Sequence, residues 1–340
     1  MNSQTSMRPV GVIILNWNGE RMLREYLPSV VRHTPSSIAD VIVADNGSTD
    51  GSIELLKSDF PSVRLLEFPQ NHGFAEGYNK AIAETGYKYT VLLNSDVAVD
   101  SDWLTPLLQF MEEHSDVAAC QPKILSMRTP SSFEYAGAAG GYIDRNGYPY
   151  CRGRIFADVE ADNGQYDTPA TDLFWATGAA LMVRTDLYLR AGGLDAKFFA
   201  HMEEIDLCWR LQLLGYKIAA VPAGHVYHLG GGSLDASNPR KTYLNFRNNL
   251  LMLHKNLPDN VRCSTLLRRR LLDTLAWCKF VATLDFPNAA AILRAHRDFA
   301  RMRKAYTDHP DIDLLHTQPR RCNILIEYFL HHRKHFSDLR

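Results

Sequence analysis

Residues 40–52 read DVIVADNGSTDGS, an apolar run that ends in an aspartate and passes directly into a turn. A continuous apolar run is typical of a strand that is buried on both faces, as in a parallel sheet. Asp45 stands before the turn, at the end of that strand, where an unpaired carboxylate would be costly. A nucleobase N–H is one partner that such a carboxylate can accept from, and plain turn chemistry is the alternative.

Strand and helix signals alternate on both sides of this segment up to about residue 100. Buried strands are expected over 10–15, 40–45, 63–68 and 89–94. Helices are expected over 21–31, 52–60 and 74–86, from helical spacing and from Gly and Pro stop signals. This alternation predicts an α/β fold, Rossmann-like, with a mostly parallel central sheet covered by helices.

Polar clusters follow three of these strands. They are Asn16-Trp17-Asn18, Asp45-Asn46-Gly47-Ser48 and Asn94-Ser95-Asp96. Because ligands bind beyond the carboxyl ends of parallel strands, the three clusters are expected to converge on one ligand site.

The charge of the chain is unevenly distributed. The chain has 340 residues, 46% apolar and 22% charged, which suits one large domain or one domain with an appendage. The last 100 residues hold 18 Lys and Arg against 9 Asp and Glu, although the whole chain carries a net charge of −1. This basic segment, mainly helical after Pro239, favours a polyanionic partner such as nucleic acid or an anionic membrane surface. A solvated helical face is the alternative.

The six cysteines lie far apart and form no C-x-x-C pair. This argues against a zinc module or a disulfide framework and fits a reducing cytosol. The N-terminal residues lack the charged, apolar and cleavage-site regions of a signal peptide. The stretch LLDTLAWCKFVATL is interrupted by Asp273 and Lys279 and is too short to span a bilayer.

Several common catalytic signatures are missing from the sequence. It contains no Walker-type G-x-x-x-x-G-K-[ST] loop and no G-x-S-x-G nucleophile elbow. GAAGG at 137–141 lacks the spacing and the context of a dinucleotide fingerprint, which disfavours a dehydrogenase.

Three further features carry candidate chemistry. Glu203, Glu204 and Asp206 start a predicted helix among apolar residues, where burial raises a carboxyl pKa and suits a general base. Complementation of the helix dipole is the alternative. Asn71, Gly73 and Asn79 suggest a backbone that approaches a ligand closely, or a capped helix start. His228 precedes a Gly-rich loop, as an exposed metal ligand would, although a lone histidine is more often structural.

The motifs as a set resemble the bacterial family 2 glycosyltransferases, in particular the rhamnosyltransferase-like branch. In order they are VIILNWNG, VIVADNGSTDGS, NHGFAEGYNKAI, LLNSDV, WATGAALMVR, GGLDAKFFAHMEEIDLCWRLQLLGY and VYHLGG, within residues 8–255. The resemblance implies a GT-A fold, a nucleotide-diphosphate sugar donor, transfer with inversion, and a divalent metal, Mn²⁺ or Mg²⁺. It suggests a catalytic domain over 8–240 and a basic helical extension over 241–340.

The resemblance also assigns roles to individual residues. Asp96 takes the last position of the family's D-x-D motif and would hold the metal, with His228 completing the shell. Glu203 and Glu204 fall on the Glu-Asp pair whose second member is the general base. Substrate binding is assigned to Asn16, Trp17, Asn18, Asp45, Asn71, Gly73, Asn79, Asn94, Ser95, Trp175 and Asp206.

Two residues depart from the family pattern. Asn94 replaces the first carboxylate of D-x-D, so the metal would see one charge fewer. Glu204 stands where the family has Asp, and Glu203 remains an alternative base.

These features predict an inverting glycosyltransferase that uses a dTDP- or UDP-sugar, with dTDP-rhamnose as one candidate donor. The acceptor would be a glycan or a lipid-linked hydroxyl in cell-surface polysaccharide synthesis. The alternatives are a sugar nucleotidyltransferase and a non-catalytic sugar-nucleotide or glycan-binding protein. A nucleotidyltransferase would need a basic, Gly-rich loop after the first strand, which Asn16-Trp17-Asn18-Gly19 does not provide.

The basic segment LLRRRLLDTLAWCKFVATL has apolar residues at helical spacing, with Arg268, Arg269 and Arg270 in its polar part. It is hypothesised to rest on the inner leaflet of a cytoplasmic membrane near a lipid-linked acceptor. Packing on the catalytic domain is the alternative, and no nucleic-acid partner is expected.

Overall fold

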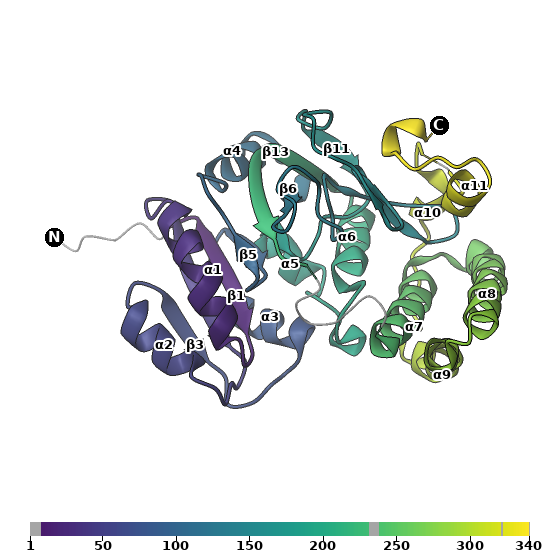
Figure 1. Cartoon of the computed structure of the whole chain (residues 1–340), viewed down its shortest axis with the longest axis horizontal. Helices are drawn as coiled ribbons and strands as arrows, with labels where there is room; N and C mark the ends of the chain where they lie inside the picture. The colour runs from purple at the N-terminus through teal and green to yellow at the C-terminus, as the bar shows by residue number, and fades with distance from the viewer. Residues whose placement is uncertain (1–7, 231–237, 321, 340) are drawn as a thin grey trace.

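The computed structural model describes residues 8–230, 238–320 and 322–339 (Figure 1). A larger, nine-stranded sheet consists of β1 (Val10–Asn16), β2 (Ala39–Asp45), β3 (Arg64–Glu67), β4 (Tyr89–Leu93), β5 (Val97–Ala98), β6 (Val117–Ser126), β11 (Ala170–Leu173), β12 (Ala180–Arg184) and β13 (Lys217–His228). A smaller sheet consists of β7 (Gly141–Ile143), β8 (Pro149–Cys151), β9 (Arg154–Ile155) and β10 (Asp158–Val159). The α-helices are α1 (Glu20–His33), α2 (Ser52–Asp59), α3 (Phe74–Ala83), α4 (Thr105–Glu113), α5 (Thr185–Arg190), α6 (Glu203–Leu213), α7 (Pro239–Asn256), α8 (Asp259–Ala282), α9 (Phe286–Met302), α10 (Leu314–Thr317) and α11 (Ile324–Phe329). Short 3₁₀ turns cover Ala196–Phe198, Arg303–Ala305 and Phe336–Asp338.

The larger sheet has the strand order β11-β13-β6-β12-β4-β1-β2-β3, with β5 paired to β13. Strands β4, β1, β2 and β3 run parallel, and β6 and β13 form a second parallel pair. β12 lies antiparallel between β4 and β6 and joins the two parallel parts. The α/β prediction for the first hundred residues is thus confirmed, with element bounds within a few residues of those expected. The expected burial of the third strand is wrong, because β3 lies at the edge of the sheet with Arg64 and Glu67 exposed.

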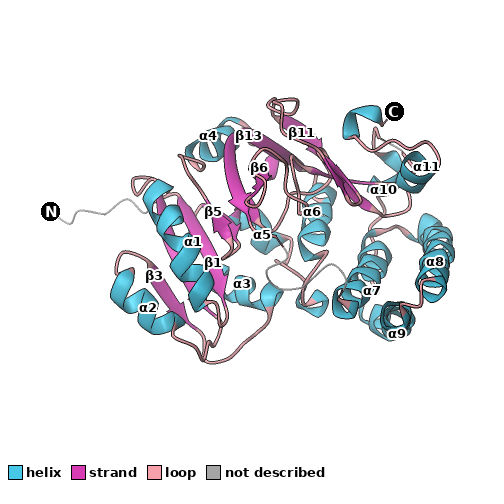
Figure 2. Ribbon diagram, viewed as in Figure 1, coloured by secondary structure: helices cyan, strands magenta, loops and turns pink. Residues whose placement is uncertain are grey.

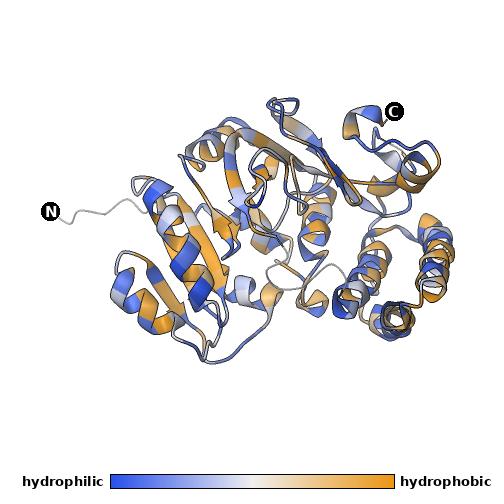
Figure 3. Ribbon diagram, viewed as in Figure 1, coloured by the Kyte–Doolittle hydropathy of each residue, from blue (hydrophilic) through white to orange (hydrophobic). Residues whose placement is uncertain are grey.

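Helices cover both faces of the sheet because side chains alternate along each strand. Val12 and Ile14 of β1 join the cluster that contains α1, α2 and α4. Ile13, between them, joins the cluster that contains α3 and α6. β1 is therefore apolar on both faces, and the ribbon of β1 is mostly orange in Figure 3. Its carboxyl end carries the polar residue Asn16.

Residues 130–170, expected as a long loop or hairpin region, contain the smaller sheet. β7, β8, β9 and β10 pair antiparallel in chain order (Figure 2). Gly141 of β7 has to be glycine, because a Cβ there would lie 2.1 Å from the Trp175 indole ring. This close approach holds Trp175 in the core, only 4% exposed, with its Nε1 donating to the carbonyl of Tyr142 at 2.8 Å.

The C-terminal segment is helical, but its first helix is part of the core. Leu250, Leu251, Met252 and Leu253 of α7 are fully buried, and Asn249 donates to the carbonyl of Gly147 at 2.6 Å. The division of the chain at residue 240 stays a prediction. None of the helices in the described ranges is long and apolar enough to cross a bilayer, and all six cysteines are free thiols.

Arg269 does not lie on the polar surface of α8 as expected. Its guanidinium is buried, donates to Asp273 at 2.8 Å and stacks 3.8 Å from the centre of the Tyr148 ring. Only Arg268 and Arg270 of the three arginines face outward, at least in part. The i, i+4 pair with Asp273 and the aromatic ring of a distant segment explain the difference.

A buried charge network joins α6 to α7. The fully buried carboxylate of Asp206 accepts from Arg210 at 2.9 Å, from Lys255 at 3.0 Å and from Asn256 at 2.7 Å. Lys255 also pairs with Asp195 at 2.9 Å. This environment gives Asp206 a structural role and does not support its assignment to substrate binding.

We expect Asp206→Ala to lower the free energy of unfolding by about 3–5 kcal/mol, because it leaves buried cations without their partner. Asp116→Ala is the matched control, since it removes the same side chain from the exposed pair with Lys217. Urea titrations of both variants measure the effect. Equal unfolding midpoints for the two variants would show that the network contributes no more than a surface ion pair.

Candidate functional site

The three polar clusters converge at one edge of the sheet, as the topology required. Asn16 and Asp45 are aligned partners at the ends of β1 and β2, and Leu93 at the end of β4 is aligned with Ile14. Asn94, Ser95 and Asp96 follow β4 directly and are half-buried. The expectation that these segments share one rim is therefore confirmed.

The first part of the rim is a hydrogen-bonded double loop. Asn16 Nδ2 donates to Asp45 Oδ2 at 2.9 Å, and the Ser48 amide donates to Asp45 Oδ1 at 2.9 Å. Asn18, in a left-handed conformation with φ of 49°, accepts from the Thr49 amide at 2.7 Å. Trp17 projects from this loop with 57% of its surface exposed.

Asp45 is fully buried, and both of its oxygens are hydrogen-bonded within the protein. In this arrangement it orients Asn16 and the turn, and a nucleobase reaches it only after Asn16 moves. Asn16 is itself unusual, because its Oδ1 is buried and has no hydrogen-bond partner among the described residues. The role of Asp45 in base recognition stays a prediction.

The loop at residues 71–73 is tied to the same rim. Asn71 Oδ1 accepts from Asn46 Nδ2 at 3.1 Å and from the Gly73 amide at 2.7 Å. Gly73 has φ of 80° and lies against the Phe199 ring, which a Cβ would approach to 3.5 Å. Asn79 differs, since it bonds both backbone groups of Leu194 and the Tyr188 hydroxyl, so its environment is structural.

Asp96 and His228 face each other across the site, with Asp96 Oδ1 3.1 Å from His228 Nε2. The amide of Asn94 lies 3.4 Å from the same nitrogen. The other ring nitrogen, Nδ1, lies 3.2 Å from Glu134 Oε2. The imidazole is thus held between two carboxylates, and only 5% of His228 is exposed.

This arrangement fits a divalent cation. A metal-bound histidine commonly presents one ring nitrogen to the metal and the other to a carboxylate, which is the geometry of His228 between Asp96 and Glu134. Within the described ranges no group of three or more His, Cys, Asp or Glu residues is placed to hold a metal alone. Asp96 and His228 would therefore leave coordination positions for water and for donor phosphates, as Mg²⁺ usually requires.

The charge state of His228 follows from the same contacts. Burial lowers its pKa, but the hydrogen bonds and charges of Asp96 and Glu134 outweigh burial and raise the pKa to about 9. The imidazolium thus offsets part of the charge of the two carboxylates, and a metal ion that bound at Nε2 would have to displace its proton.

Glu203 and Glu204 open α6 beside this rim. Glu204 packs on Gly178: a Cβ added to this glycine would lie 3.7 Å from the Cβ of Glu204. The carbonyl of the next residue, Ala179, accepts a hydrogen bond from the backbone amide of Asn94 at 3.0 Å. One carboxylate oxygen of each glutamate, Oε2, is buried without a hydrogen-bond partner among the described residues.

Burial raises the pKa of both glutamates. The pKa of Glu203 lies well above the ordinary value because of burial and the adjacent charge of Glu204. Burial raises the pKa of Glu204 to about 6, with backbone amides limiting the rise. A carboxyl group with a pKa of about 6 is mostly ionised at neutral pH and can accept a proton, which favours Glu204 as the base.

The loop before this pair is strained. Phe199, His201 and Met202 have φ of 68°, 69° and 72°, values that non-glycine residues rarely adopt. Asn248 of α7 holds the loop, because its Nδ2 contacts the carbonyl oxygens of Phe198, Ala200 and His201 at 3.0, 2.8 and 2.8 Å. Arg247 donates to the Phe198 carbonyl at 2.8 Å.

Glu134, Arg247 and Asn248 were not found from the sequence. Glu134 lies in an irregular segment with no periodic pattern to mark it. Arg247-Asn248-Asn249 did leave a signal, because these three successive polar residues directly precede the apolar run Leu250–Leu253 in the same helix. Trp175 was assigned to substrate binding, but its burial beneath Gly141 does not support a direct contact.

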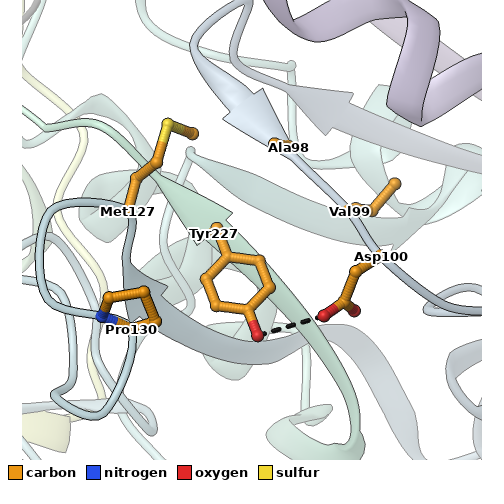
Figure 4. A pocket seen from close by; sticks show the side chains of 6 residues that line it. All are labelled: Ala98, Val99, Asp100, Met127, Pro130 and Tyr227. Atoms are coloured by element: carbon orange, nitrogen blue, oxygen red, sulfur yellow. Dashed lines mark hydrogen bonds between the residues drawn. The ribbon is translucent and has the colours of Figure 1, made fainter.

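A cavity of about 280 Å³ lies where β13 pairs with β5, at Tyr227 and Ala98. Figure 4 shows its lining by Ala98, Val99, Asp100, Met127, Pro130 and Tyr227. The Tyr227 hydroxyl donates to Asp100 at 3.1 Å, and Tyr227 pairs with Ala98 next to the His228–Val97 pair.

Comparisons with known proteins agree with this geometry. Residues 11–150 match the family described as glycosyl transferase family 2. The chain is 26% identical over 233 residues to the N-acetylglucosaminyl-diphospho-decaprenol L-rhamnosyltransferase of Mycobacterium tuberculosis, covering 64% of this chain and 75% of that one. It is 41% identical over 174 residues to the rhamnosyltransferase WbbL of Escherichia coli, covering 46% and 61%.

A solved structure, GalNAc-T7 with UDP, GalNAc and Mn²⁺, shares the fold with a TM-score of 0.58 at 15% identity. The match covers 75% of this chain and 49% of that one, so this chain spans about half of that structure. Together the matches confirm the resemblance to family 2 glycosyltransferases and the GT-A fold.

The raised pKa of Glu204 predicts a pH-dependent effect on stability. The Glu204 carboxyl group binds its proton more tightly in the folded wild type than in the unfolded chain, so the protein loses stability as pH rises through about 6. Glu204→Gln removes this loss, and its free energy of unfolding relative to the wild type should be about 1–2 kcal/mol higher at pH 7.5 than at pH 4. Chemical denaturation at both pH values measures the difference.

Glu113→Gln is the control, because it removes the same charge from an exposed position on α4. A Glu204→Gln variant with the same relative stability at both pH values would contradict the raised pKa.

Proposed function

We propose that this glycosyltransferase moves a sugar, with inversion, from a dTDP- or UDP-sugar to a hydroxyl of a glycan or lipid-linked acceptor in cell-surface polysaccharide synthesis. The observation that carries the proposal is the buried pair Glu203–Glu204, linked through Gly178 and Ala179 to the strand end that bears Asn94 and Asp96. A base thus lies next to the predicted donor-diphosphate site. The rhamnosyltransferase relatives favour dTDP-rhamnose as the donor.

The residues would divide the work as follows. Trp17 offers an exposed aromatic face to the nucleobase, and Asn16, Asn18 and Ser48 shape the loop around it. Asp96 and His228 would hold a divalent cation, Mn²⁺ or Mg²⁺, which neutralises charge on the departing diphosphate when bound. Asn94 supplies an amide where the family usually has a carboxylate, so a weaker metal affinity is expected.

Glu204 would remove the proton from the acceptor hydroxyl as its oxygen attacks the anomeric carbon of the donor sugar. The bond between that carbon and the diphosphate oxygen breaks, and the nucleoside diphosphate leaves. Attack from the side opposite the leaving group inverts the anomeric configuration.

Glu204→Gln tests the assignment of the base. Transfer should fall by about 10²–10⁴-fold, the usual contribution of a general base, while donor affinity changes little. Turnover with dTDP-rhamnose and the relatives' acceptor type, together with calorimetric titration of the nucleotide, measures the two quantities separately.

Unchanged turnover in Glu204→Gln would refute the base. A variant that loses donor affinity as well would place Glu204 in donor binding instead. Glu113→Gln serves again as the control for removal of one carboxylate.

We also infer a peripheral contact between α8 and an anionic membrane. Leu267, Leu271 and Leu275 recur every four residues on one side of α8 and are 62%, 63% and 66% exposed. The opposite side packs on the protein through Leu266 and the Arg269–Asp273 pair. Exposed leucines in a basic segment are typical of a helix that lies in a membrane interface.

Leu271→Glu with Leu275→Glu should reduce binding to anionic liposomes at least about 10-fold, because two apolar contacts are replaced by negative charges that the anionic lipid repels. Flotation with anionic and zwitterionic vesicles measures the effect. Leu189→Glu, at a leucine on α5 that is 53% exposed, is the matched control. Equal flotation of the double variant and the wild type would contradict membrane contact through α8.

A further inference from the structure

A second cavity, of about 250 Å³, lies between α7 and α9. Arg240, Tyr243, Arg294 and Asp298 line it. Its volume is below the range of about 300–1,000 Å³ that is usual for drug-sized ligands, so it suits a compact group better than a whole nucleotide sugar.

The cavity carries two arginines without carboxylate partners. The Arg240 guanidinium lies 5.1 Å from the centre of the Phe199 ring, and Arg294 is exposed. Over the ranges that the structure describes, neither guanidinium forms an ion pair. Two free guanidinium groups in one small cavity create a site for an anion with several oxygens, which they can bind in bidentate fashion.

Asp298, the only carboxylate among the four lining residues, is already neutralised by other groups. It accepts from the Tyr243 hydroxyl at 2.9 Å and from Arg297 at 3.2 Å, and it also pairs with Arg301. Burial raises its pKa, but these partners outweigh burial and lower the pKa to about 2. Its charge therefore leaves the positive charge of Arg240 and Arg294 available to a ligand.

We propose that this cavity binds the diphosphate of a lipid-linked acceptor. The proposal rests on the proposed function and adds to it the place where the diphosphate of a lipid-linked acceptor binds. The donor diphosphate would occupy the separate site at Asp96 and His228, so the protein would hold two diphosphates in two different ways, one through a cation and one through arginines.

The cavity is linked to the segment that bears the candidate base through the contact of Arg240 with Phe199. Phe199, against which Arg240 stacks, touches Gly73 on one side and begins the strained loop that leads to Glu203 and Glu204. α7, which bears Arg240, also holds this loop through Asn248. An acceptor anchored at Arg240 is thus anchored to the segment that positions the base.

The surroundings favour a lipid diphosphate over a free one. Leu293, next to Arg294 on α9, is 58% exposed, and Phe286 at the start of α9 is 57% exposed. An apolar chain that leaves the cavity can follow this helix, while free diphosphate gains nothing from it. Burial of apolar area on Leu293 would then add to the affinity of the lipid form.

Direct binding measurements test the proposal without turnover. Farnesyl diphosphate, inorganic diphosphate and UDP are titrated calorimetrically into the full chain without divalent cations, below the critical micelle concentration of the lipid. Farnesyl diphosphate should bind more tightly than inorganic diphosphate. Arg294→Gln, whose side chain has no other partner over the described ranges, should weaken it about 10-fold, and Arg240→Gln with Arg294→Gln about 100-fold.

Two control variants locate the site. Arg32→Gln, on α1 at the opposite side of the molecule in Figure 1, removes the same charge and should leave the affinity unchanged. Asp96→Asn should also leave it unchanged, because Asp96 belongs to the donor site. Loss of binding in Asp96→Asn, or wild-type affinity in the double arginine variant, would overturn the proposal.

Equal affinities for farnesyl and inorganic diphosphate would overturn the lipid assignment. A protein that binds farnesyl diphosphate through these arginines but transfers no sugar would leave the cavity assignment intact and refute only the proposed function.

Discussion

The contact between Asp96 and His228 joins the two halves of the central sheet. Asp96 follows β4, which belongs to the N-terminal parallel part of the sheet. His228 ends β13, which belongs to the part formed by later segments of the sequence. A distance of 3.1 Å between their side chains is reached only if β12 packs between β4 and β6 and brings β13 to the same rim. The position of the glutamate pair depends on the same rim, because Gly178 and Ala179 precede β12.

Burial of charge is the energetic difficulty of this site, and the protein meets it in different ways. The imidazolium of His228 offsets part of the charge of Asp96 and Glu134. Glu203 and Glu204 pair with no cation among the described residues, so burial raises the pKa of both, that of Glu204 to about 6. The strained loop before them is held from α7 through Asn248, so this helix supports the segment that bears the two glutamates.

The parts of the fold that could be predicted from the sequence are those in which local pattern and tertiary structure agree. β1, β2 and β4 are continuous apolar runs, so their burial followed directly, and the convergence of Asn16, Asp45 and Asp96 followed from parallel pairing. β3 was expected to be buried too, but it is the edge strand of the sheet and exposes Arg64 and Glu67. Glu134 could not be predicted, because it reaches His228 from an irregular segment whose path depends on long-range contacts. Arg269 was placed on the surface because helical spacing alone does not reveal that Asp273 and Tyr148 surround it.

The most direct test of the central claim is a crystal structure with Mn²⁺ and either dTDP or UDP, with diffraction recorded at the manganese absorption edge. The account predicts an anomalous peak at bonding distance from an Asp96 carboxylate oxygen and from His228 Nε2, with the nucleotide diphosphate on the same ion. Bound nucleotide without manganese, or manganese bound away from both residues, would contradict it.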